Sequence, residues 1–273
     1  MRNFLVFLLL PLAGCTSIQQ TEQFATDTFI AGEPGNFHGF AMYSFVYQDR
    51  QCRIVAPRRA AEGNPWLWRA RFFGHRPEVD LALLNKGFYV AYMDVADLYG
   101  NPAAVDLWDD FYELLTNRYH FAPRAALEGM SRGGLMVFNW TLAHPERVAC
   151  IYADAPVCDL KSWPGGLMEG VGSPEDWQKS QQAYGLTEAE AVAFRASPVD
   201  RATELAKTGV PLLVVSGDQD TVVPYAENAA VLVAAYQEQG SRVKTIIKRG
   251  EGHVHGLNNA SPIVRFVVKH AKP

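Results

Sequence analysis

Short apolar runs alternate with longer amphipathic stretches along this chain of 273 residues. Five runs are almost wholly apolar, which is typical of strands that are buried on both faces of a parallel sheet. They span residues 88–93, 125–130, 147–153, 210–216 and 243–247. Since helical patterns separate these runs, we expect a mostly parallel sheet with helices on both faces.

The segments around these runs complete the predicted order of elements. Residues 37–47 and 51–57 predict an antiparallel pair of strands, and residues 64–73 predict a third strand that passes into a loop. Helices are predicted at 77–86, 103–119, directly after Ser131, at 225–239 and at 262–270. The stretch 159–208 is too long for a simple crossover, and we interpret it as a small helical cap over the carboxyl ends of the strands.

Composition narrows the class of protein. The chain is 48% hydrophobic and 20% charged, which suits one α/β domain with a sizeable core, expected over residues 31–273. The net charge of −4 and the pI of about 6.0 give no indication of a nucleic-acid or anionic-membrane partner. We expect no cofactor and no metal ion, and the sequence does not specify an oligomeric state.

The first residues are set aside from fold reasoning because they have the pattern of an export signal. A basic start precedes the apolar run Phe4–Leu12, and Leu-Ala-Gly-Cys ends at Cys15. This resembles the bacterial lipoprotein signal. The resemblance implies removal of residues 1–14, lipidation of Cys15, a tether over 15–30, and a periplasmic or cell-surface location, with Thr16 favouring the outer membrane of a Gram-negative bacterium. An ordinary signal peptide is the alternative.

Three further cysteines follow, Cys52, Cys150 and Cys158. An exported protein can form disulfides, and Cys150 and Cys158 could pair if the chain turns back. Buried free thiols are the alternative.

The motif Gly-x-Ser-x-Gly at 129–133 lies between an apolar strand and a predicted helix. Glycines permit the tight strand-to-helix turn that holds Ser131 clear of the strand. Taken alone, the motif could equally be a glycine-rich turn with a solvated serine.

Two later loops favour a catalytic serine over a solvated one, because each loop also follows a predicted strand. Residues 217–224 contain Asp218 and Asp220, and residues 249–253 end at His253. The carboxyl ends of parallel strands meet at one edge of a sheet.

Together these motifs resemble those of the α/β-hydrolases over residues 37–270. In that family the elbow serine, the aspartate of Gly-x-x-Asp-x-x-Val-Pro and the histidine of Gly-x-Gly-His form a catalytic triad, which implies Ser131, Asp220 and His253. Ser131 would be the nucleophile, His253 the general base and Asp220 the residue that orients the imidazole. Asp218 and His255 are the alternatives for the acid and the base.

The surrounding residues suggest an acidic carbohydrate substrate. The elbow Gly-x-Ser-Arg-x-Gly is similar to that of glucuronoyl esterases and related pectin methylesterases, which implies that Arg132 helps to bind the oxyanion. A second oxyanion donor is expected near Trp68 or Arg69. Arg69, Arg71 and Arg132 could bind a uronate carboxylate. Four aromatic residues could stack on sugar rings, namely Trp66, Trp68, Tyr99 and Trp163. Alternatively the tryptophans are core residues and the arginines pair with Asp94 or Asp97.

Three functions follow from this pattern. The first is a serine esterase that cleaves carboxylic esters of a polysaccharide, such as uronate methyl esters or acetyl esters, in polysaccharide degradation. The second is a serine peptidase of the prolyl-oligopeptidase kind. The third is a non-catalytic binding lipoprotein, which an intact serine, aspartate and histidine argue against.

Overall fold

The structure is a computed structural model that describes residues 30–271. The predicted signal segment, Cys15 and nearly all of the predicted tether lie outside the described residues, so the lipid anchor stays a prediction. Within the described range, no helix combines the length and the apolar character needed to cross a membrane.

One nine-stranded sheet runs through the described chain, in the order β1-β2-β3-β5-β4-β6-β7-β8-β9. The strands are β1 (Glu33–Phe37), β2 (Phe40–Tyr47), β3 (Arg50–Ala56), β4 (Trp66–Arg69), β5 (Tyr89–Met93), β6 (Ala125–Met130), β7 (Val148–Asp154), β8 (Leu212–Gly217) and β9 (Val243–Lys248). Three pairs are antiparallel, namely β1–β2, β2–β3 and β3–β5. The remaining pairs are parallel, namely β5–β4, β4–β6, β6–β7, β7–β8 and β8–β9. Parallel strands present their carboxyl ends at one edge, as the sequence predicts for the loops that follow β6, β8 and β9.

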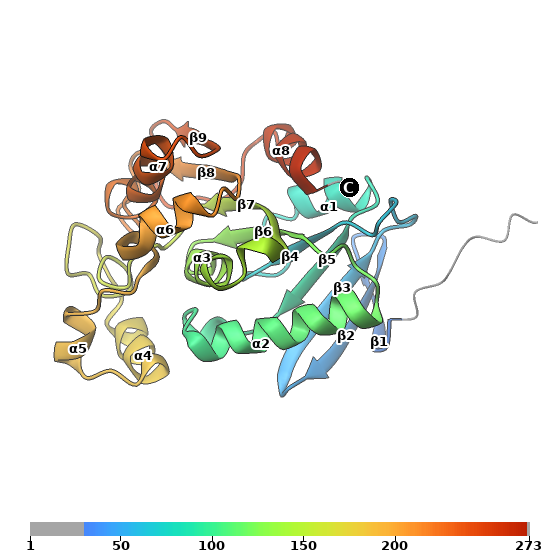
Figure 1. The fold of residues 1–273 in the computed structure, drawn as a ribbon, viewed down its shortest axis with the longest axis horizontal. Helices are drawn as coiled ribbons and strands as arrows, with labels where there is room; N and C mark the ends of the chain where they lie inside the picture. The colour runs from blue at the N-terminus through green and yellow to red at the C-terminus, as the bar shows by residue number, and fades with distance from the viewer. Residues whose placement is uncertain (1–29, 272–273) are drawn as a thin grey trace, which may run out of the picture.

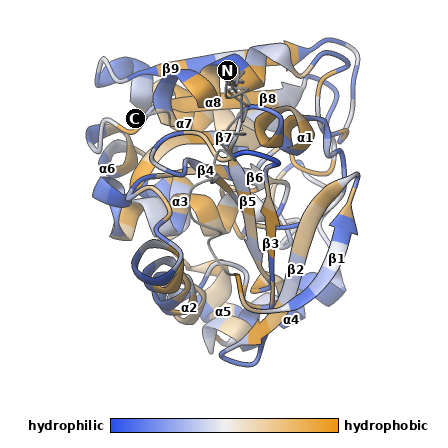
Figure 2. Ribbon diagram, turned by 90° about the vertical axis from the view of Figure 1, so that its right-hand side faces the viewer, coloured by the Kyte–Doolittle hydropathy of each residue, from blue (hydrophilic) through white to orange (hydrophobic). Residues whose placement is uncertain are grey.

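Helices cover both faces of the sheet (Figure 1). One face is covered by α1 (Glu78–Leu84) and α8 (Ser261–Ala271), and the other by α2 (Pro102–Glu113), α3 (Gly133–Ala143), α6 (Ala202–Lys207) and α7 (Ala229–Glu238). Short turns complete the order: η1 (Ala96–Leu98), η2 (Leu114–Arg118), η3 (Pro145–Arg147), η4 (Pro198–Arg201) and η5 (Tyr225–Glu227). Hydrophobic colour is concentrated on the interior strands and the helices that face them (Figure 2).

Tryptophans form the centre of the core under α2 and α3. The indole rings of Trp68 and Trp108 stack with centroids 3.9 Å apart, and Trp140 meets Trp68 edge-on at 5.1 Å. All three are fully buried. Offset stacking and edge-to-face contacts each add roughly 0.5–1.5 kcal/mol to the free energy gained from burial. Trp66 is fully buried as well, so Trp66 and Trp68 are core residues, and the predicted sugar-stacking role of both is wrong.

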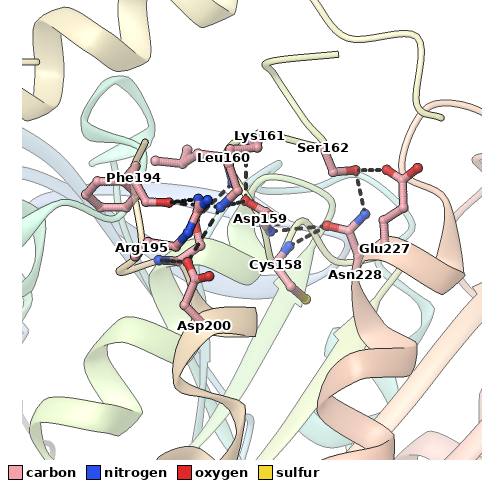
Figure 3. A network of polar contacts seen from close by, with 11 residues as sticks. Cys158, Asp159, Leu160, Lys161, Ser162, Phe194, Arg195, Asp200, Glu227 and Asn228 are labelled. Carbon is pink, nitrogen blue, oxygen red and sulfur yellow. Dashed lines mark hydrogen bonds and ion pairs between the residues drawn. The ribbon is translucent and has the colours of Figure 1, made fainter. Parts of the chain in front are cut away.

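The segment between β7 and β8 holds α4 (Pro174–Tyr184) and α5 (Glu188–Val192), which project from one end of the molecule in Figure 1. Asn228 fixes this segment to the loop that follows β8 (Figure 3). Its amide oxygen accepts hydrogen bonds from the N–H groups of Cys158 (2.8 Å) and Asp159 (3.2 Å), and its amide nitrogen donates to the hydroxyl of Ser162 (2.9 Å). The same hydroxyl donates to Glu227 at 2.6 Å. Buried, fully paired amides of this kind fix one arrangement.

The structure also differs from the sequence predictions in detail. The chain forms an additional edge strand, β1, and the third predicted strand is only four residues long. The long helix predicted over 103–119 is α-helical to Glu113 and then continues as the π-helical turn η2. Cys52, Cys150 and Cys158 are all buried and unpaired, so the possible disulfide between Cys150 and Cys158 does not form.

Candidate active site

Ser131 lies in a strained turn between β6 and α3. Its φ of 47° is in the left-handed region, which costs a residue with a side chain about 1–3 kcal/mol. Surrounding contacts hold this conformation: the Ser131 N–H donates to the carbonyl of Asp154 (2.9 Å), and the Ser131 carbonyl accepts from Gly134 and Val157 (both 2.9 Å). Gly129 is required because a β-carbon there would lie 2.6 Å from a methyl group of Val137. The turn therefore presents the hydroxyl at the sheet edge.

Three side chains from distant parts of the sequence meet at this turn. The Nε2 atom of His253 lies 3.0 Å from the hydroxyl oxygen of Ser131, and its Nδ1 atom lies 2.7 Å from a carboxylate oxygen of Asp220. The other oxygen of Asp220 accepts from the N–H groups of Val222 and Val223 at 2.9 and 2.8 Å. Asp220 is thus held in place by backbone donors and can orient the imidazole.

The two alternative residues lie elsewhere. Asp218 accepts a hydrogen bond from the N–H of Gly250 at 2.7 Å, so it connects two loops. The ring of His255 lies 4.9 Å from the ring of His253, and its Nε2 atom is buried without a partner among the described residues. Burial, with repulsion from His253 and His75, lowers the pKa of His255 to about 3, so the ring is neutral. His253, not His255, contacts the serine.

Asp154, a buried residue that the sequence analysis did not single out, connects the turn that carries Ser131 to the loop that carries His253. Asp154 ends β7; its carbonyl accepts from Ser131, and its side chain accepts from the N–H of Gly256 (2.6 Å) and the hydroxyl of Tyr152 (2.5 Å). Gly256 ends the segment Arg249–Gly256, here called the base loop, which carries His253. Asp154 therefore contacts both the serine turn and the base loop. An acidic residue at the carboxyl end of a predicted strand is the signal that could have indicated it.

Arg69 lies beneath the site in a fully buried cluster. Its guanidinium is 2.6 Å from Asp80 and 3.4 Å from Glu128, and none of the three is exposed. Burial raises the pKa of Glu128 well above its usual range, and the pKa of Asp80 is raised as well. Because one guanidinium faces two carboxyl groups, we assign a proton to Glu128, which can donate it to Asp80. The predicted oxyanion and substrate roles of Arg69 are wrong, since its side chain cannot contact a ligand.

An open cleft of about 790 Å³ flanks the serine turn, and Arg71 and Arg132 line it together with Asp94 and Asp176. Arg132 pairs with Asp176 at 2.9 Å. Arg71 makes no ion pair among the described residues, and its Nε atom is buried without an acceptor. Burial, with repulsion from Arg132, lowers the pKa of Arg71. The cleft therefore contains one guanidinium that forms no ion pair with a described residue, although Asp94 and Asp176 attract it from a longer distance and partly offset the lowering of its pKa.

Two aromatic residues, Tyr99 in the cleft and Trp163 beside it, pack against Arg132. Its guanidinium lies 4.8 Å from the ring centroid of Tyr99 and 5.6 Å from that of Trp163. Tyr99 is only 2% exposed, and its hydroxyl donates to Asp176, so it supports Arg132 and offers no open face to a sugar. Trp163 is half-buried and keeps part of its surface accessible. The predicted stacking role is therefore wrong for Tyr99.

Two backbone N–H groups near Ser131 have no acceptor within the described residues, those of Arg132 and Arg71. Arg71 packs directly on the serine turn, since its nitrogen lies 3.6 Å from the position that a β-carbon on Gly133 would take. The N–H groups of the preceding residues are used by the sheet; that of Ala70, for example, donates to Glu128. The free N–H groups are thus those of Arg132 and Arg71, whereas the second oxyanion donor was predicted near Trp68 or Arg69.

Comparison with known proteins identifies the family to which the chain belongs. The family model described as "Prolyl oligopeptidase family" matches residues 82–272. The chain belongs to this family. A search of the curated proteins gave no match.

Solved structures show the same fold at low sequence identity. Pyrococcus horikoshii acylaminoacyl peptidase matches with a TM-score of 0.65 at 17% identity, over 88% of this chain and 42% of that one. Porphyromonas gingivalis dipeptidyl peptidase 4 matches at 0.62 and 17%, over 85% of this chain and 35% of that one. An S-formylglutathione hydrolase from Agrobacterium tumefaciens matches at 0.62 and 14%, over 87% of this chain and 95% of that one.

The chain thus spans less than half of the length of these peptidases and nearly the whole length of the esterase. The predicted α/β-hydrolase fold is confirmed.

Proposed function

We propose that this chain cleaves carboxylic esters of an acidic carbohydrate through a covalent acyl-enzyme, with Ser131 as the nucleophile. The observation that carries the substrate class is the guanidinium of Arg71, which lies unpaired in the cleft beside the serine turn. The side chain of Arg71 is half-buried, with its Nε atom fully buried, so a ligand of opposite charge would offset its partial desolvation. A carboxylate of a uronic acid has the planar geometry that a guanidinium binds through two hydrogen bonds.

The chemistry follows from the contacts of His253. Its Nε2 atom takes the proton of Ser131 as the hydroxyl oxygen attacks the ester carbonyl, and Asp220 stabilises the resulting imidazolium. The carbonyl oxygen becomes an oxyanion that the N–H groups of Arg132 and Arg71 bind. The imidazolium then protonates the leaving alcohol, and a water molecule deprotonated by His253 hydrolyses the acyl-serine.

The experiment measures hydrolysis of methyl-esterified polygalacturonate, by methanol release, beside p-nitrophenyl acetate. We expect Ser131→Ala to abolish both activities while the protein stays folded. Arg71→Gln should raise KM for the uronate ester about tenfold or more, the loss expected for a charge-assisted hydrogen bond of about 1.5–3 kcal/mol, and should leave p-nitrophenyl acetate hydrolysis within about threefold.

Arg58→Gln is the matched control for Arg71→Gln. Both arginines rest on a phenylalanine ring, Arg58 on Phe40 and Arg71 on Phe72, but Arg58 is outside the cleft. The control should behave as the wild type. Equal loss on both substrates in Arg71→Gln would contradict a role in substrate selection.

Peptide-bond hydrolysis is the second candidate, favoured by the match to the prolyl oligopeptidase family and by the peptidase structures of similar fold. Turnover of peptide anilides that depends on Ser131, without turnover of the uronate ester, would replace the first proposal by this one. A folded wild type without turnover of any substrate would favour a binding role.

We further propose that the protein acts outside the cytoplasm, anchored by a lipid on Cys15. The Leu-Ala-Gly-Cys motif after the apolar run supports this. Metabolic labelling with a palmitate analogue tests it, and a Cys15→Ala variant that is labelled equally would contradict it.

A further inference from the structure

A second cavity lies at the opposite end of the sheet from Ser131, between the start of β9 and the helix α8. It measures about 410 Å³, within the range of ligand pockets. Four cationic side chains line it, and we call it the basic groove. They are Arg242, Lys244, Arg265 and Lys269.

None of these four cations forms an ion pair with a described residue, and no carboxylate lines the basic groove. This concentration of charge is notable because the whole chain carries a net charge of −4. Burial, with repulsion from Lys269 and Arg242, lowers the pKa of the adjacent His270, as expected where no anion is near.

Protection of a sheet edge explains only part of the basic groove. β9 is the outermost strand, and a lysine such as Lys244 discourages pairing with another chain. Arg265 and Lys269, however, are on α8, four residues apart, where like charges destabilise a helix slightly. An anionic ligand would remove that penalty.

The shape and the side chains favour a carbohydrate over a membrane surface. The half-buried ring of Phe266 lines the basic groove and packs on His270 with centroids 4.8 Å apart, which provides an apolar face for a sugar ring. None of the large apolar side chains that are exposed in the described chain lines the basic groove, so an amphipathic anchor for lipid is lacking there.

We propose that the basic groove binds a stretch of acidic polysaccharide, a chain of carboxylated sugars, and so keeps a long substrate on the enzyme between cleavage events. This inference rests on the proposed function. The six residues of β9 span roughly 17 Å at about 3.3 Å per residue, and Ser131 follows β6, which is separated from β9 by β7 and β8. The basic groove and Ser131 would therefore contact different sugars of one polymer.

The experiment compares the wild type with Arg265→Glu/Lys269→Glu. Affinity for polygalacturonate without methyl esters is measured by calorimetry and by retardation in gels that contain the polymer, at low and at high salt. We expect at least a tenfold weaker affinity in the variant, a steep salt dependence in the wild type, and p-nitrophenyl acetate hydrolysis unchanged within twofold.

A charge-matched control is Arg118→Glu/Arg195→Glu, which changes two exposed arginines outside the basic groove. It should bind as the wild type does. Equal weakening in the control, or no binding by the wild type, would overturn the inference. Capture by phosphatidylglycerol vesicles that is lost in the groove variant, without binding of polygalacturonate, would overturn it in favour of lipid.

The outcome is separable from that of the proposed function. If the wild type binds polygalacturonate through the basic groove but releases no methanol from its methyl ester, the proposed function fails and the binding site stands. If methanol is released and the groove variant binds normally, only the binding site fails.

Discussion

Replacing Glu128 by glutamine tests the buried cluster on which the site is built. Glu128 is on β6, three residues before Ser131, and shares Arg69 with Asp80. Glutamine has nearly the shape of a protonated glutamic acid, and its amide can donate a hydrogen bond to Asp80. If Glu128 carries a proton in the folded protein, the substitution should be nearly neutral at pH 7, within about 1 kcal/mol.

If Glu128 is ionised instead, the loss of stability expected for Glu128→Gln is clearly larger. If Glu128 were ionised and paired with Arg69, glutamine would break a buried ion pair at a cost of about 3–5 kcal/mol. For a protein of this size 1 kcal/mol shifts Tm by roughly 2–4 °C. An ionised Glu128 therefore predicts that the substitution lowers Tm by at least about 6 °C, whereas a protonated Glu128 predicts a decrease of at most about 4 °C.

The dependence on pH has a definite sign. Because burial raises the folded-state pKa of Glu128 well above its ordinary value of 4.5, this group favours folding at low pH, and that contribution is lost as pH rises from about 4.5 toward the folded pKa. Glutamine does not titrate. The Tm of Glu128→Gln relative to the wild type should therefore increase as pH rises.

Thermal unfolding followed by circular dichroism between pH 5 and 9 measures this difference, with Glu62→Gln, an exposed position, as control. A variant that loses more than about 6 °C at pH 7, with no relative gain toward pH 9, would refute the assignment of the proton to Glu128.

Three further predictions concern the residues around Ser131. Asp154→Asn should lower kcat about tenfold with little change in KM, because the substitution weakens the hydrogen bond from Gly256 that fixes the base loop. A lower Tm with an unchanged kcat would show that Asp154 has a purely structural role. His255→Gln should leave the pH–rate profile above pH 5 unchanged, since the ring is already neutral there, and a displaced acidic limb would contradict this. Gly134→Ala should cost about 1–3 kcal/mol in urea unfolding, because its β-carbon would lie 2.6 Å from the carbonyl of Val157; unchanged stability would mean that the turn adapts.

The parallel part of the fold could be predicted because its signals are local. Strands such as β7 and β8 are short, continuous apolar runs, and their length and apolar composition identify them as buried strands. The edge strand β1 has the sequence Glu-Pro-Gly-Asn-Phe, in which only Phe37 favours a strand, and β1 is held by its pairing with β2. Its existence depends on tertiary contacts that the local sequence does not encode.

The same distinction applies to the site. Ser131, Asp220 and His253 were found because each is part of a short motif after a strand. The direction of a side chain is not local: Arg69 and Arg71 are two residues apart on an extended segment, yet Arg69 lies among buried carboxyl groups and Arg71 reaches the cleft. Which of the two could bind a ligand depended on Asp80 and Glu128, from α1 and β6. Asp80 and Glu128 are charged residues within largely apolar elements, and this was the signal in the sequence that could have indicated a buried partner for Arg69.

Covalent labelling tests the central claim most directly. The purified protein is treated with a fluorophosphonate, and the modified peptide is identified by mass spectrometry. The geometry predicts a single adduct on Ser131, absent from Ser131→Ala and formed at least a hundredfold more slowly in His253→Ala, roughly the contribution of a general base. No adduct on the folded wild type, or an adduct on another residue, would contradict the assignment of Ser131 as the nucleophile.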